Sequence, residues 1–262
     1  MIEESVTFGG FDAQPMDLYI ARPDKLSPGL IIVHEVYGLN ENIKGIARRF
    51  AAEGFASFAP NLYSRDKGFL NEASIVEAMS IFSSIPVEKR GNPEAMKEAA
   101  SGLSENSRKV IDTVFGARGP LEENMTKDLQ NLYDYVNTRD YVYRDHVGAT
   151  GFCLGGGMAF ELAVESPIRA VFVFYGRNPA PIDRVSKMAA NFMGVYAGED
   201  PRIDAGLPEL VSAFSRHKKN FTIKMYAEAF HGFFNDTGKA FNPVAASDAW
   251  ELALRHFRKN LM

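Results

Sequence analysis

The sequence predicts an α/β protein in which a mostly parallel sheet of about eight strands carries helices on both faces. Short β-branched and aromatic runs alternate with longer segments of helical periodicity, and several runs are apolar throughout, as in strands buried on both faces. With 262 residues, 46% of them hydrophobic and 24% charged, the chain has the size and composition of an ordinary globular α/β domain. We therefore expect one domain over residues 1–262, with right-handed crossovers.

The predicted elements follow in order along the chain. An antiparallel edge is expected from strands at Glu4–Phe8 and Asp17–Ala21. The remaining strands are predicted at Gly29–His34, Phe55–Ala59, His146–Thr150, Ala170–Tyr175, Phe192–Ala197 and Phe221–Tyr226. Apolar residues at helical spacing predict helices around Ile43–Ala51, Met125–Val136 and Trp250–Phe257.

The alternation is interrupted from Ser64 to about Leu121. This segment has weak helical pattern at Ala73–Phe82, a charged stretch EKRGNPEAMKE and a second helical piece at Arg108–Phe115. Roughly 60 residues with few large apolar groups would be marginal as a separate domain. We expect a helical insertion, about 64–121, that covers the carboxyl edge of the sheet as a lid. The alternative is that this segment is a solvent-exposed insertion without a functional role, since long insertions are well tolerated.

The stretch GFCLGGG places the chain's single cysteine, Cys153, between a predicted strand and a predicted helix. This is the pattern of a nucleophile elbow, in which a strained turn lifts one side chain above the sheet. Small residues are needed two positions on either side, and Gly151 and Gly155 supply them. A free cysteine is more commonly a small buried apolar residue, so the other catalytic groups must also appear in the right order.

In the α/β-hydrolase fold that order is nucleophile, acid, histidine. Asp200 follows the predicted strand Phe192–Ala197, and His231 follows the predicted strand Phe221–Tyr226. Both lie just past strand carboxyl ends, where open α/β sheets place their sites. Glu199 and Asp204 compete with Asp200, but the Gly-x-Asp placement favours Asp200.

The run LIIVHEVYGLN delivers His34 and Glu35 from a buried strand to a loop. In this fold that loop donates one backbone N–H to an oxyanion hole, and the residue after the nucleophile donates the other. Val36 and Leu154 are the expected donors. A glutamate beside the hole would repel an oxyanion unless it points elsewhere, for example towards the cysteine.

The blocks HEVYGLN, PNLY, GFCLGGG, AGED and FHGF, in this order, resemble the dienelactone hydrolases (carboxymethylenebutenolidases) over about three quarters of the chain. The resemblance implies an α/β-hydrolase fold with Cys153 as nucleophile, His231 as base and Asp200 as its orienting acid. It also implies that Glu35 interacts with a neutral resting thiol, which becomes a thiolate as substrate binds.

The chain departs from the family pattern in its expected substrate anchors. The family binds a substrate carboxylate with arginines, one of them four residues after the catalytic histidine, and here that position is Asn235. Arg65 and Arg118 are candidate substitutes, with surface solvation as the competing role. Tyr37, in the loop with Glu35, is a further candidate for substrate binding.

Composition and charge exclude several other classes of function. A net charge of −4 with mixed signs gives no basic surface for nucleic acid or for a membrane. No apolar span or leader is recognised, so we expect a cytoplasmic protein. One cysteine excludes an internal disulfide, and no Cys and His spacing suggests a metal. We expect no cofactor, and the oligomeric state stays open.

The sequence therefore predicts a cysteine-dependent hydrolase that cleaves a small ester or lactone through a thioester intermediate. A general carboxylesterase or thioesterase with the same triad is the first alternative. The second is a non-catalytic relative that binds a ligand and keeps the elbow for packing.

Overall fold

The computed structural model describes residues 1–85, 92–116 and 118–262. These residues form an eight-stranded sheet with strand order β1-β2-β4-β3-β5-β6-β7-β8. β2 pairs antiparallel with β1 and with β4, and every other pair is parallel. The predicted fold class, including its antiparallel edge, is confirmed. The strands are β1 (Ile2–Gly9), β2 (Pro15–Arg22), β3 (Ser27–Val33), β4 (Ala56–Pro60), β5 (Val142–Phe152), β6 (Ala170–Phe174), β7 (Asn191–Ala197) and β8 (Phe221–Tyr226).

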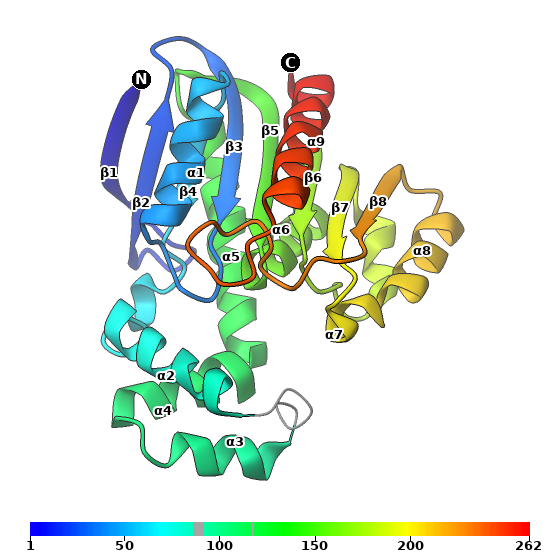
Figure 1. The fold of residues 1–262 in the computed structure, drawn as a ribbon. Helices are drawn as coiled ribbons and strands as arrows, with labels where there is room; N and C mark the ends of the chain where they lie inside the picture. The colour runs from blue at the N-terminus through cyan, green and yellow to red at the C-terminus, as the bar shows by residue number, and fades with distance from the viewer. Residues whose placement is uncertain (86–91, 117) are drawn as a thin grey trace.

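Helices cover both faces of the sheet. In Figure 1, α1 and α9 lie in front of the strands, and α5 and α6 lie behind them. The helices are α1 (Glu41–Ala52), α2 (Glu72–Ser84), α3 (Pro93–Ala100), α4 (Glu105–Val110), α5 (Arg118–Asn137), α6 (Leu154–Glu165), α7 (Pro201–Asp204), α8 (Leu207–Arg216) and α9 (Pro243–Leu261). Shorter turns are η1 (Ser64–Asp66), the π-helix η3 (Ile111–Gly116) and η4 (Ile182–Lys187).

Strand β3 illustrates how the sequence pattern builds the two buried layers. Ile31 and Val33 belong to the apolar cluster that includes α5, α6 and α8. Leu30 and Ile32 belong to the cluster that includes α1 and α9. Because side chains alternate across a strand, a continuous apolar run fills both layers at once.

The helices begin where the sequence provides caps. The side chain of Asn40 accepts a hydrogen bond from the Ile43 N–H at 3.2 Å and starts α1. Asn242 accepts one from the Ala245 N–H at 3.1 Å and starts α9, with Pro243 in its first turn. Such caps satisfy N–H groups that have no partner within the helix.

The segment between β4 and α5 is helical and lies beyond the carboxyl ends of the parallel strands (Figure 1). Its buried residues Leu70, Ile75 and Ile81 join the same apolar cluster as α5. The charged stretch also contains α3, which the periodicity did not predict. Asn92 starts α3 by accepting the N–H groups of Glu94 and Ala95. The predicted role as a lid stays a prediction.

None of the helices in the described ranges has both the length and the apolar character that crossing a membrane requires.

Candidate active site

The carboxyl ends of the strands bring five chemically functional side chains to one edge of the sheet. Glu35 follows β3, Cys153 follows β5, Tyr175 follows β6, Asp200 follows β7 and His231 follows β8. Four of these strands are consecutive neighbours in the sheet, and β3 pairs with the first of them. Parallel strands end at the same edge, so residues far apart in sequence meet there.

Cys153 occupies a strained turn between β5 and α6. Its backbone φ of 55° and ψ of −116° lie outside the regions that ordinary residues favour. Its N–H donates to the Phe174 carbonyl at 3.1 Å, which fixes the turn to β6. A Cβ atom on Gly151 would stand 2.0 Å from the Gly155 carbonyl oxygen, so only glycine fits there. The turn therefore has the geometry of a nucleophile elbow.

His231 and Asp200 form a hydrogen-bonded pair between the β7 and β8 loops. Nδ1 of His231 contacts Oδ2 of Asp200, whose side chain is buried. Backbone bonds connect the two loops, with the Gly198 N–H on the Tyr226 carbonyl at 2.9 Å and the Glu199 N–H on the Ala229 carbonyl at 3.0 Å. Among the described residues, Asp200 is the acid of this turn that the structure pairs with His231.

His231 also interacts with Cys153. A hydrogen bond joins His231 to Cys153. Burial disfavours a charged imidazole, but the negative charge of Cys153 and the hydrogen bond that His231 donates to Asp200 outweigh this effect and raise the pKa of His231 to about 10. The imidazole of His231 therefore holds a proton readily beside Cys153.

Glu35 is buried and held by two donors. The Tyr175 hydroxyl donates to Oε1 at 3.2 Å, and the Asn235 amide donates to Oε2 at 2.8 Å. Burial raises the pKa of Glu35, and these two hydrogen bonds partly oppose that rise. Both carboxylate oxygens therefore have partners other than the thiol. The charge of His231 also lowers the pKa of Glu35, and the ring centroid of Tyr175 lies 5.0 Å from that of His231.

Asn235 has a different place from the expected substrate anchor. Its amide nitrogen holds Glu35, and its oxygen accepts from the Thr237 N–H at 3.0 Å and the Thr237 hydroxyl at 2.7 Å. Both polar groups of the Asn235 side chain thus have hydrogen-bond partners within the protein. Tyr37 lies at the rim, 38% exposed, and its pKa is raised by burial and by the charges of Glu35 and Cys153.

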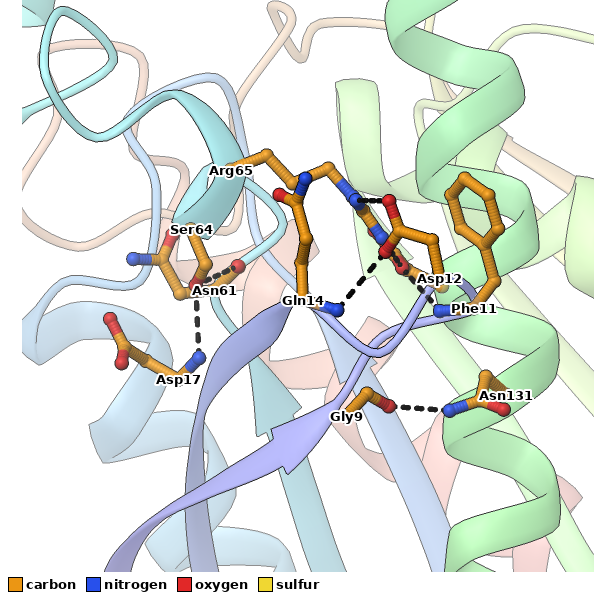
Figure 2. A network of polar contacts seen from close by, with 10 residues as sticks. Gly9, Phe11, Asp12, Gln14, Asp17, Asn61, Ser64, Arg65 and Asn131 are labelled. Atoms are coloured by element: carbon orange, nitrogen blue, oxygen red, sulfur yellow. Dashed lines mark hydrogen bonds and ion pairs between the residues drawn. The ribbon is translucent and has the colours of Figure 1, made fainter.

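Arg65 is not brought to this site. Its guanidinium forms two hydrogen bonds with the buried carboxylate of Asp128, at 2.8 and 2.5 Å, and an ion pair with Asp12 at 2.7 Å. Figure 2 shows Arg65 reaching from η1 to Asp12 in the turn between β1 and β2. This network gives Arg65 a structural role. Arg118 begins α5, and its side chain lies outside the described part of the structure.

The expected oxyanion donors lie on the two backbone segments that flank Cys153. Leu154 is the first residue of α6, where an N–H has no partner within the helix. Val36 follows Glu35, and its carbonyl accepts a hydrogen bond from the Tyr63 hydroxyl at 3.0 Å. No group of three His, Cys, Asp or Glu residues within residues 1–85, 92–116 and 118–262 is arranged to hold a metal ion.

Sequence reasoning did not assign roles to Tyr175 and Tyr63. Tyr175 ends the apolar run AVFVFY and so stands at a strand carboxyl end, the same signal that found Asp200 and His231. Tyr63 lies in the PNLY block, but no local pattern shows which backbone group its hydroxyl reaches.

Comparison with known proteins identifies relatives of this chain over nearly its whole length. A sequence model described as the dienelactone hydrolase family matches residues 16–261. A protein of Saccharolobus solfataricus named putative carboxymethylenebutenolidase is 42% identical over 256 residues, covering 98% of each chain. A Synechocystis protein of the same name is 27% identical, covering 93% of this chain and 91% of its own.

A solved structure has the same fold. The crystal structure of a putative dienelactone hydrolase from Klebsiella pneumoniae aligns with a TM-score of 0.73 at 22% identity, over 99% of this chain and all of that one. The family match over nearly the whole chain and the 42% identical relative lead to one conclusion. The chain belongs to the dienelactone hydrolase family and is a hydrolase of that type.

Proposed function

We propose that this hydrolase cleaves a small lactone or ester through a thioester on Cys153. The observation that carries the proposal is the contact of His231 with both Cys153 and Asp200 above a strained elbow. A buried structural cysteine needs neither an imidazole partner nor an unfavourable backbone. The names of the relatives, putative carboxymethylenebutenolidases, support a lactone as the substrate class.

The chemistry proceeds in two balanced steps. With the thiol proton on His231, Sγ of Cys153 attacks the carbonyl carbon, and the resulting oxyanion lies between the Val36 and Leu154 N–H groups. The C–O bond breaks, and the leaving alkoxide takes the proton from His231. A water then gives a proton to His231 and attacks the thioester carbonyl. The C–S bond breaks, the carboxylic acid is released, and the Cys153 thiolate beside protonated His231 is restored.

Glu35 has a modulating role in this proposal. Its charge lies near the thiolate and disfavours it, whereas the imidazolium of His231 favours it. Burial also disfavours the charged form of Glu35. The protonation state of its carboxyl therefore responds to a ligand that binds beside it. A ligand that displaces or neutralises this charge makes the thiolate more favourable.

Activity and covalent trapping test the proposal. Cys153→Ala should abolish hydrolysis of a fluorogenic acetate ester while thermal unfolding stays close to wild type. Mass spectrometry of wild type quenched in acid should find the acyl group on the peptide containing Cys153. Full activity of Cys153→Ala would refute the nucleophile, and wild type with no esterase or lactonase activity would favour a ligand-binding role.

Two further measurements refine the assignment. A panel of lactones and linear esters separates a lactonase from a general carboxylesterase or thioesterase by the ratio of kcat/KM values. Glu35→Gln should speed alkylation of Cys153 by iodoacetamide near neutral pH and should alter turnover, because it removes a negative charge near the thiolate. Unchanged alkylation together with unchanged turnover would remove Glu35 from the mechanism.

A further inference from the structure

His34 is a fully buried imidazole that the proposed chemistry does not use. It lies between the loop after β3 and the turn after β4. Its Nδ1 is 2.7 Å from the Glu35 carbonyl oxygen, and its Nε2 is 3.1 Å from the Leu62 backbone nitrogen. A buried histidine with two short polar contacts has a defined orientation and a defined tautomer.

The contacts assign the tautomer. The Leu62 N–H is a donor, so Nε2 of His34 must accept and carries no proton. The Glu35 carbonyl is an acceptor, so Nδ1 must carry the proton and donate. Complete burial lowers the pKa of His34 to about 4, so the ring stays neutral at ordinary pH.

The carbonyl that His34 contacts belongs to the same peptide group as the Val36 N–H. A peptide group is planar, so a hydrogen bond that fixes the direction of the C=O also fixes the direction of the N–H. A donor on the oxygen also polarises the group and strengthens the hydrogen bond that its N–H gives, by about 10–30%. The contact thus acts on the expected oxyanion donor itself.

We propose that His34 is a positioning residue that aims and polarises the Val36 N–H towards the oxyanion. The inference rests on the proposed function, because it requires an oxyanion at Cys153. This positioning role differs from a packing role, because it requires a proton on Nδ1 of His34 and a hydrogen bond from that nitrogen to the Glu35 carbonyl.

The neighbouring peptide provides an internal comparison. The Tyr63 hydroxyl donates to the Val36 carbonyl at 3.0 Å, and its ring centroid lies 4.9 Å from that of His34. This bond holds the same loop, but the peptide that it acts on carries the Tyr37 N–H. The Glu35 carbonyl also accepts a hydrogen bond from the Gly38 N–H at 3.1 Å, so His34 is one of two donors to it. A general loosening of the loop would follow from losing either the Tyr63 or the His34 bond, whereas only loss of the His34 bond removes a donor from the Glu35 carbonyl.

Two substitutions separate the two ring nitrogens. His34→Asn places an amide near Nδ1, so it keeps a donor for the Glu35 carbonyl and loses the acceptor for Leu62. His34→Gln places an amide near Nε2, so it keeps the acceptor and loses the donor. We expect similar thermal destabilisation in both, but a kcat about 2- to 8-fold lower in His34→Gln than in His34→Asn, with KM little changed, because about 10–30% of one donor's contribution is lost. Loss of a whole oxyanion donor would cost about 100- to 1,000-fold.

Two further readouts distinguish an effect on the oxyanion hole from an effect on the thiol. The carbonyl stretching frequency of a trapped acyl-enzyme should rise in His34→Gln, because weaker donors polarise the carbonyl less, and should stay near wild type in His34→Asn. Alkylation of Cys153 by iodoacetamide should be alike in both variants, since displacement of iodide forms no oxyanion. Tyr63→Phe should lower kcat less than His34→Gln.

The outcomes are decisive in each direction. Equal kcat and equal carbonyl frequency in the Asn and Gln variants would overturn the inference, while an inactive Cys153→Ala in the same assay would leave the proposed function standing. An active Cys153→Ala would instead refute the proposed function. If neither His34 variant folds, NMR of the wild-type imidazole decides, because a proton on Nε2 in place of Nδ1 excludes the proposed hydrogen bond.

Discussion

Replacing Gly155 by alanine should push apart the two backbone segments that carry the proposed oxyanion donors. Gly155 lies in the first turn of α6 and packs against the end of β3. A Cβ atom there would stand 2.3 Å from the Val33 carbonyl oxygen and 2.4 Å from that of His34. An ordinary contact begins at 3.4 Å, and both obstacles are backbone atoms that have no rotamer to change. The helix must therefore move by about 1 Å away from the loop that carries Val36.

The magnitude follows from that displacement. Overpacking of this kind costs about 1–3 kcal/mol, and the better helix propensity of alanine returns about 1 kcal/mol. We expect a net loss of ~2 kcal/mol at most, or a Tm lower by roughly 4–8 °C for a chain of this size. Misplacing a donor by 1 Å can cost about 100-fold in rate, so kcat should fall more than stability suggests.

The assay compares Gly155→Ala with Gly157→Ala on the same helix. A Cβ at Gly157 meets Cγ of Arg177 at 3.0 Å, and this side chain can shift by the few tenths of an ångström required. Gly157→Ala should therefore keep wild-type kcat and an equal or higher Tm. Hydrolysis of an acetate ester and thermal unfolding are measured for both. Wild-type kcat and Tm in Gly155→Ala would refute the packing argument.

Three further predictions concern the charged groups. Asp200→Asn should lower kcat by about 1,000- to 10,000-fold, because the imidazole loses its orienting acceptor, while Glu199→Gln stays near wild type; the reverse pattern would reassign the acid. In Cys153→Ala, NMR titration should place the pKa of His231 below the value of about 10 in wild type by ~1–3 units, since the opposite charge is gone; an unchanged pKa would contradict a thiolate partner. Arg65→Met should lower the free energy of unfolding by ~3 kcal/mol with kcat and KM unchanged, and a raised KM for carboxylate substrates alone would return Arg65 to the site.

Local sequence pattern predicted the elements and the elbow because both depend on short-range chemistry. The run LIIV determines a strand buried on both faces, and its alternate residues fill the two apolar clusters. The glycines around Cys153 permit close approach of backbone, which is a local requirement. Helix α3 was not predicted because its sequence signal is only an N-cap, Asn92 followed by Pro93. The charged stretch around it has little hydrophobic periodicity.

The sequence by itself determined which residues end the strands, and therefore which side chains the parallel sheet gathers at one edge. It did not determine which of those side chains contact one another. Asn235 reaches Glu35 across 200 positions, and Arg65 reaches Asp128 across 63. A hydrogen bond needs a distance and a direction that arise only when distant loops are packed together, whereas a strand needs only its own alternation. For that reason the order of Cys153, Asp200 and His231 along the chain could be predicted from the motifs, whereas the hydrogen-bond partners of Glu35, Arg65 and His34 were decided by the tertiary structure.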